Sequence, residues 1–293
     1  MTVRPAARDD YTALAELFEL ADEAVLGRRI PIDESEVDGW LQGVALEKNT
    51  WLFEEDGKLV AGAFAQLHGD KGTLAGAVHP DFQHRGYGAR LLQLAEERLV
   101  AEGAARLHGW TTAGDDRAAD LFQSRGFAEV RRFWEMEIAL DAEPPGPAPA
   151  VEQFRLEDAR VFHAALEEAF ADHWEPHPEP FEKWWERQQR RSNYDPSLWF
   201  VIRDGDEIAA ICRNEARESC GYVGALGVRR AWRGRGYGRA LLLHTFGEFR
   251  RRGLPRVTLG VDAANPTGAT RLYESVGMHV LREDIVWEKS VSP

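Results

Sequence analysis

The chain has 293 residues, of which 44% are hydrophobic and 29% charged, a composition typical of a globular protein. Its length suits about two domains of ~150 residues each. The chain has 36 lysines and arginines and 49 acidic residues. The resulting formal charge of −13 disfavours nucleic acids and anionic membranes as partners. Two cysteines, no signal-peptide core in the first ten residues and no apolar run of ~18 residues predict a reduced, cytoplasmic protein.

The first half of the chain predicts alternating strands and helices. A short strand at Val3–Pro5 precedes an amphipathic helix at Asp10–Glu23, and a hairpin follows at Trp51–Leu67. A strand at Thr73–Val78 runs into a glycine-rich segment, after which leucines recur at helical spacing. A strand, a short helix and a final strand complete a mixed α/β domain.

The segment Asp141–Ala150 separates the two halves. Four of its ten residues are proline and none is a bulky apolar residue, which indicates a semi-rigid extended linker. We therefore predict domains at residues 1–140 and 151–293, joined by a linker at 141–150.

The second half repeats the first. The segment that begins at His79 aligns with the one that begins at Arg229 at an offset of 150. The segment that begins at Gly109 aligns with the one at Gly260 at an offset of 151. A helix at Asp158–Phe170, a hairpin and a strand at 222–228 also recur, so the chain is a tandem duplication of one α/β fold.

A glycine-rich segment, Arg233–Gly238, lies between a predicted strand and a predicted helix. Glycines allow a tight turn there and expose successive backbone N–H groups at a helix start, which suits a pyrophosphate. The spacing matches neither the dinucleotide fingerprint nor a P-loop, and a glycine-rich turn that binds nothing is the alternative.

Two separated motifs in the chain resemble those of the GCN5-related N-acetyltransferases (GNAT). Their pyrophosphate loop, Arg/Gln-x-x-Gly-x-Gly/Ala, fits Arg233–Gly238 and again Gln83–Gly88. Farther along, Asn265, Leu272-Tyr273 and Gly277-Met278 follow the order of that family. The resemblance implies two tandem GNAT folds, each a mixed, mostly antiparallel sheet flanked by helices, with acetyl-coenzyme A as the acyl donor.

The same resemblance assigns residues to the binding of acetyl-coenzyme A. In the second half these are Leu226, Gly227, Val228, Arg233, Gly234, Arg235, Gly236, Tyr237, Gly238 and Asn265. In the first half they are Val78, Gln83, His84, Arg85, Gly86, Tyr87 and Gly88.

The two halves differ in the residues that carry chemistry. In the family, the tyrosine at the position of Tyr273 commonly protonates the departing thiolate, and a phenol of pKa ~10 can do so. The first half has Phe122 there, and Gly114 in place of Asn265. Residues 229–256 also hold nine arginines and one acid, whereas residues 79–106 hold four arginines and four acids. We therefore predict a catalytic second domain and a catalytically degenerate first domain.

The general base and the acceptor site are harder to assign. Many family members carry a carboxylate on the strand before the pyrophosphate loop, and here residues 222–225 include none. His173 and Glu215 are candidate bases, with a surface histidine and a solvated charge as the alternatives. The aromatic segment after the first helix of the second half predicts an acceptor pocket lined by Asp172, Trp174 and Phe181. Packing between the domains would also explain those aromatic residues.

The sequence therefore predicts an N-acetyltransferase that acts on the primary amine of a small molecule. One alternative is the narrower activity of tandem members that acetylate a cysteinyl sugar. Another is a non-catalytic sensor that binds acyl-coenzyme A. The internal repeat favours a monomer, and no metal ligands are assigned.

Overall fold

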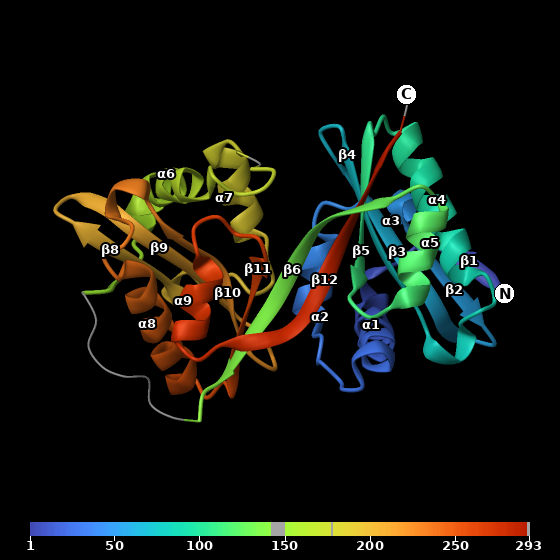
Figure 1. Cartoon of the computed structure of the whole chain (residues 1–293), viewed down its shortest axis with the longest axis horizontal. Helices are drawn as coiled ribbons and strands as arrows, with labels where there is room; N and C mark the ends of the chain where they lie inside the picture. Colours follow the sequence, from blue (N-terminus) through green and yellow to red (C-terminus); the bar gives the residue numbers. More distant parts are fainter. Residues whose placement is uncertain (142–149, 177, 292–293) are drawn as a thin grey trace. The chain divides into compact units, whose positions relative to one another are not determined.

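The computed structural model describes residues 1–141, 150–176 and 178–291 (Figure 1). The chain divides into two compact units. The amino-terminal unit comprises Met1–Phe133 and Arg282–Pro293, and the carboxy-terminal unit comprises Trp134–Leu281. The predicted linker lies outside the described residues from 142 to 149.

The amino-terminal unit is built on a sheet with the strand order β1-β2-β3-β4-β5-β12. The pairs are antiparallel except for β4 and β5, which run parallel, so the predicted mixed and mostly antiparallel sheet is confirmed. The elements in chain order are β1 (Thr2–Arg4), α1 (Tyr11–Leu26), α2 (Glu34–Leu41), α3 (Leu46–Asn49), β2 (Thr50–Glu55), β3 (Lys58–His68), β4 (Lys71–Val78), α4 (Tyr87–Ala101), β5 (Arg106–Thr112), α5 (Asp116–Ser124) and the start of β6 (Ala128–Ala139).

The carboxy-terminal unit repeats this plan with the order β6-β11-β10-β9-β8-β7. Strands β10 and β11 are parallel, and β9 pairs antiparallel with both β10 and β8. Its elements are β7 (Glu152–Gln153), α6 (Ala159–Phe170), α7 (Phe181–Gln189), β8 (Trp199–Asp204), β9 (Glu207–Ala216), β10 (Gly221–Val228), α8 (Tyr237–Arg251), β11 (Arg256–Asp262), α9 (Ala269–Ser275) and the start of β12 (His279–Ser290).

The last strand of each repeat completes the sheet of the other repeat. Residues 284–290 of β12 pair with β5, and Trp287 stacks on Phe122 in the amino-terminal unit. Residues 134–139 of β6 belong to the carboxy-terminal unit, where β6 is the neighbour of β11. The compact units therefore cut across the expected boundaries, because unpaired strand edges accept any partner of suitable register.

Helices cover both faces of each sheet, and glycines mark where they approach most closely. A Cβ on Gly62 would lie 3.1 Å from Leu14 of α1, and one on Gly72 would lie 2.7 Å from Leu99 of α4. In the other unit, Gly227 packs on Ala169 of α6, and Gly221 packs on Phe249 of α8. This layering leaves the ends of β4 and β10 between a helix end and a glycine-rich loop.

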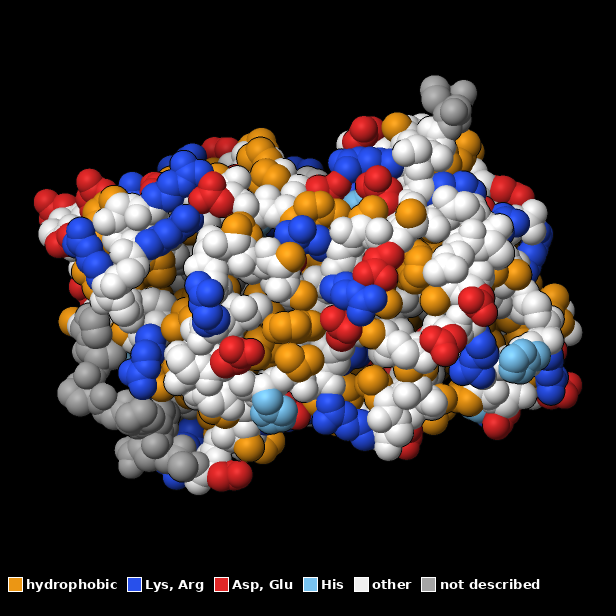
Figure 2. Space-filling model, in the orientation of Figure 1, with side chains coloured by type: hydrophobic (Ala, Val, Ile, Leu, Met, Phe, Trp, Pro, Cys, Tyr) orange, Lys and Arg blue, Asp and Glu red, His pale blue; other side chains and the backbone are white. Residues whose placement is uncertain are grey.

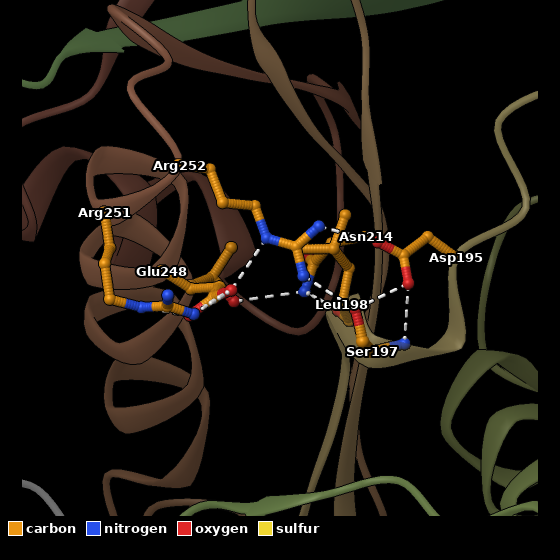
Figure 3. Close-up of polar contacts among 8 residues, drawn as sticks. Asp195, Ser197, Leu198, Asn214, Glu248, Arg251 and Arg252 are labelled. Atoms are coloured by element: carbon orange, nitrogen blue, oxygen red, sulfur yellow. Dashed lines mark hydrogen bonds and ion pairs between the residues drawn. The ribbon is translucent and has the colours of Figure 1, made fainter.

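Polar contacts fix the carboxyl end of α8 to the segment before β8 (Figure 3). The guanidinium of Arg252 donates to Asp195 and to Ser197 Oγ, each at 2.6 Å, and to Glu248 at 2.7 Å. Beneath them the buried Asn214 amide donates to the Leu198 carbonyl at 2.7 Å. The exposed ion pairs stabilise the fold by at most ~1 kcal/mol each, whereas loss of the Asn214 donor, which would leave the buried Leu198 carbonyl unsatisfied, would cost about 1–3 kcal/mol.

Side chains of both charges are interspersed on the face shown in Figure 2, although the chain has an excess of acids. Across the described residues, every helix is too short or too polar to cross a bilayer.

Candidate active site

Both glycine-rich loops adopt the backbone that a phosphate site requires. Gly86 and Gly236 precede α4 and α8 with φ of 84° and 80°, a left-handed conformation that glycine adopts without strain. Each loop directs the N-terminus of a 15-residue helix outward, and the helix dipole favours an anion there. A Cβ on Gly238 would lie 2.9 Å from Leu272, which explains a second glycine at the start of α8.

The loops differ at one strained position. Gly234 has φ 79° in the second loop, and His84 takes the matching place in the first loop with φ 60°. A non-glycine residue there costs about 1–3 kcal/mol, a cost that is characteristic of ligand-binding loops.

The side chains of both loops bind mainly to their own unit. Arg233 donates to the carbonyls of Val228 and Ala169, at 3.2 and 3.3 Å, and also pairs with Asp172. Arg235 pairs with Asp204 at 3.3 Å. These contacts hold the loop against the ends of β10, α6 and β8.

In the first loop, Gln83 accepts a hydrogen bond from Arg117, and Arg85 pairs with Glu55 at 3.1 Å. Tyr87 is buried, packs edge-on against Phe53 and donates to Glu55. Because the Tyr87 hydroxyl is engaged by Glu55, this residue can donate to a bound phosphate only through its backbone N–H.

The central parallel strands separate before they reach these loops. Strand β10 pairs with β11 at Gly221 and Tyr222, and β4 pairs with β5 at residues 71–74. Beyond those positions, residues 225–228 and 75–78 continue to pair with β9 and β3, and Gly224 lies at a shift of register between Val223 and Ala225. Leu226, Gly227 and Val228 thus lie beside a gap between strands, where backbone amides and carbonyls can bind an extended amide-containing chain.

In the amino-terminal unit this gap opens into a cavity of about 640 Å³. Its lining includes residues 73–78 of β4, Gly86 and Gly88 of the loop, and Phe122 of α5. The cavity is of the size that holds a substantial organic ligand.

Tyr273 of α9 occupies the place that Phe122 holds in α5. Its side chain is 7% exposed, and burial raises the pKa of its phenol well above the usual value. The phenol stays protonated at physiological pH, as a proton donor must, although burial also makes it a weaker acid. Phe122 offers no proton and packs between Phe127 and Trp287.

The Asn265 side chain has a local partner. Its carbonyl oxygen accepts from the backbone N–H of Thr267 at 2.8 Å and from the Thr267 hydroxyl at 2.6 Å. These bonds shape the turn that leads into α9, and Asn265 thereby sets the position of Tyr273.

His173 is half-buried in the turn after α6. Burial lowers the pKa of its imidazole, the Asp262 carboxylate opposes that shift, and the charge of Arg233 adds to it. The imidazole is therefore neutral at pH 7 and can accept a proton.

Glu215 lies in a different environment. It is 3% exposed and accepts from Arg191 at 2.7 Å, from Asn193 at 3.0 Å and from Arg213. Burial alone would raise the pKa of this carboxyl, but the charges of Arg213 and Arg191 prevail and lower it. Accepting a proton would disrupt these buried ion pairs.

Comparison with known proteins now identifies the family. The family model "Acetyltransferase (GNAT) family" matches residues 14–127 and again 162–278. The chain belongs to the GNAT family. It is accordingly an N-acetyltransferase built from two GNAT repeats.

Individual GNAT relatives share the full length of the chain. A mycothiol acetyltransferase of Thermobispora bispora is 32% identical, with 99% of this chain and all of that protein aligned. A solved GCN5-related N-acetyltransferase from Sphaerobacter thermophilus is also 32% identical, with a TM-score of 0.86 over all of this chain and 96% of that one. A tandem GNAT protein of the clavulanic acid pathway shares the fold, with a TM-score of 0.75 at 16% identity over 100% and 99% of the two chains.

The structure does not gather the expected acceptor-pocket residues of this GNAT enzyme into one site. Phe181 packs against Arg160 and His163, near the start of α6. Asp172 follows the other end of that helix, about 18 Å away at a rise of 1.5 Å per residue. Phe181 also packs against Trp184 and Trp185, as a residue of an aromatic core does, and its role in the acceptor pocket stays a prediction.

Asp172 is also bound within its own unit. It pairs with Arg230 and Arg233, whose hydrogen bonds lower the pKa of its carboxyl to about 2. Trp174 is half-buried close by in sequence. The charge of the Asp172 carboxylate is therefore neutralised by two arginines.

Sequence reasoning missed the polar group in the amino-terminal cavity. Asp22 of α1 accepts from Thr112 at 2.7 Å and from Arg282 at 2.6 Å. These residues are far apart in the chain, and the fold alone brings them together. The sequence did contain one signal: when α1 is aligned with α6, the acidic Asp22 corresponds to the aromatic Phe170.

Proposed function

We propose that the protein transfers an acetyl group from acetyl-coenzyme A to the primary amine of a small molecule, and that the carboxy-terminal unit performs the reaction. The observation that carries this proposal is the buried phenol of Tyr273 on α9. The matching position of the other unit holds Phe122.

The residues present fit acetyl-coenzyme A. The amide groups at Gly236–Gly238 and the N-terminus of α8 suit its diphosphate, and the splayed backbone of residues 226–228 suits its pantetheine amides. When bound, the thioester supplies an activated acetyl group. Arg233 and Arg235 hold the loop in shape and place positive charge beside it.

Two side chains of the protein would then carry out the two proton transfers. Neutral His173 would take a proton from the ammonium group of the acceptor, directly or through water, so that the neutral amine becomes the nucleophile, and Tyr273 would protonate the departing thiolate. Holding both reactants in one site would supply much of the rate.

A narrower activity has support from the comparisons. Relatives that align over the full length are called mycothiol acetyltransferases, and we propose a cysteinyl sugar as the second acceptor class. Against it, residues 222–225 of β10 carry no carboxylate.

A thiol-release assay with acetyl-coenzyme A tests both proposals. The panel would contain simple primary amines, aminosugars and a cysteinyl aminosugar. Turnover with amines in general supports the broad proposal, and turnover with the cysteinyl aminosugar alone supports the narrow one. Calorimetric binding of acetyl-coenzyme A without turnover on any acceptor would favour a sensor and overturn both.

A further inference from the structure

Strand β10 of the carboxy-terminal unit leaves the regular sheet at Gly224. Its pairing with β11 ends at Tyr222, and across β9 and β11, which the structure describes in full, Gly224 has no register partner. The gap between β10 and β11 therefore begins at this residue. A donor whose diphosphate lies at the loop after β10 would extend back along residues 226–228, and its acetyl group would lie toward Gly224.

The guanidinium of Arg213 on β9 lies at the same place. Its Nη2 is so close to Gly224 that a Cβ on this glycine would sit 2.7 Å from it. Among the described residues, the guanidinium makes one hydrogen bond, from Nη1 to Glu215. The edge formed by Nε and Nη2 is therefore open, and neither of these nitrogens is fully buried. Such an edge holds a carboxylate through two parallel hydrogen bonds.

A second guanidinium lies beside it and shares the same carboxylate. Arg191 donates to Glu215 at 2.7 Å, so this one buried acid accepts from both arginines. Burial lowers the pKa of the Arg191 guanidinium. Glu215 opposes this shift, and the charges of Arg213 and Arg217 add to it. Glu215 therefore does not offset the burial and mutual repulsion of the guanidiniums, and a second anion beside Arg213 would stabilise them.

We propose that the acceptor in the carboxy-terminal unit carries a carboxylate in addition to its amine, and that Nε and Nη2 of Arg213 hold this carboxylate. The inference rests on the proposed acetyl transfer in this unit and narrows its acceptor class to amino carboxylates. Binding of the carboxylate at Gly224 fixes the amine of the same molecule close to the acetyl group. It also offsets the repulsion that an ammonium group would meet beside a guanidinium.

Acceptor pairs that differ only in one charge test this inference. Each straight-chain amino carboxylate from glycine to 6-aminohexanoate is compared with its neutral amide, in a thiol-release assay with acetyl-coenzyme A and the full chain. In the best pair we expect kcat/KM to be about tenfold or more higher for the carboxylate, mainly through a lower KM. Equal turnover of both members would overturn this inference and leave the proposed function standing.

Calorimetric binding of the same pairs to the full chain repeats the comparison without turnover. Lack of turnover with every acceptor would count against the proposed function alone, provided that the carboxylates still bind about tenfold or more tightly than the amides. Carboxylates that bind no better than their amides would overturn the inference whether or not the chain is catalytic.

Variants locate the carboxylate. Arg213→Met removes the open edge and should erase the preference by raising the KM and Kd of the carboxylates, with those of the amides unchanged. Arg213→Lys keeps a charge beside Glu215 but lacks the two-nitrogen edge, and it should lose most of the preference. It supplies the test if melting curves show that Arg213→Met misfolds.

The matched control is Arg190→Met. It alters a guanidinium that is 72% exposed at the end of α7, where it pairs with Glu186, and it should keep the full preference. A preference for carboxylates that survives unchanged in a folded variant at Arg213, or that is lost equally in Arg190→Met, would overturn the proposal.

Discussion

Phe64 and Arg213 hold the same register position in the two repeats, opposite Ala75 on β4 and Ala225 on β10. Phe64 stacks on Trp40, whereas the Arg213 guanidinium lies over Gly224, where a Cβ would sit 2.7 Å from its Nη2. The duplicated sheets therefore place an aromatic ring at this position in one repeat and a guanidinium in the other. This difference is the physical basis for expecting different ligands at the two copies.

Replacement of Tyr273 by phenylalanine should lower kcat by about 10²–10⁴-fold and leave the affinity for acetyl-coenzyme A nearly unchanged. The hydroxyl contributes only when the thiolate departs, and the ring still fills the buried position. Steady-state kinetics and calorimetry on the same sample provide the measurement. Unchanged turnover would make Tyr273 a packing residue.

A matched pair of loop variants should separate the two units. Gly236→Glu places a strained residue and a carboxylate at the start of α8, where φ is 80°, and should abolish acetyl transfer. Gly86→Glu makes the same change at φ 84° in the other unit and should leave most transfer intact. Residual activity in Gly236→Glu with none in Gly86→Glu would reverse the assignment of the catalytic unit.

The pH profile should reveal His173. Burial lowers the pKa of its imidazole, so the acid limb of kcat/KM should lie below the ordinary histidine value of about 6.5. Asp262→Asn removes a charge that raises this pKa, so the limb should move to still lower pH. In His173→Gln the limb should vanish, and a limb that persists there would exclude His173 as the base.

Glu215 should contribute to stability rather than to proton transfer. Glu215→Ala leaves Arg191 and Arg213 without their shared carboxylate and should lower the free energy of unfolding by about 3–5 kcal/mol. Denaturant unfolding measures this change, with the exposed Glu218→Gln as control.

The same carboxylate should make stability pH-dependent. Its pKa is lowered in the folded state, so its contribution is fully present above the unfolded value of about 4.5 and is lost as pH falls through the folded value. Glu215→Gln should therefore flatten the acid side of a stability curve. An unaltered curve would show that the ion pairs contribute nothing measurable.

Local patterns predicted much of this fold because they depend on near neighbours in the chain. The duplicated strands and helices, the loops around Gly86 and Gly236 and the contrast between Tyr273 and Phe122 could all be read from short segments. Periodicity and glycine placement carry that information.

Contacts between distant segments could not be read in this way. Asp22 and Arg282 are separated by 260 positions, and no local signal connects them. Phe181 illustrates a second limit, since a cluster of aromatic residues suits a pocket wall and a core equally well. Glu215 illustrates a third limit, because its charge can be read from the sequence but its ion pairs with two arginines cannot.

The placement of β12 has a consequence for the order of synthesis. Residues 284–290 supply a partner for β5, yet the ribosome makes them long after the rest of the amino-terminal repeat. Until Trp287 has been synthesised, the nascent amino-terminal repeat lacks the ring that stacks on Phe122. Its folding is therefore completed only after the carboxy-terminal repeat has been synthesised, and a chaperone that shields this open edge would raise the yield of native chain.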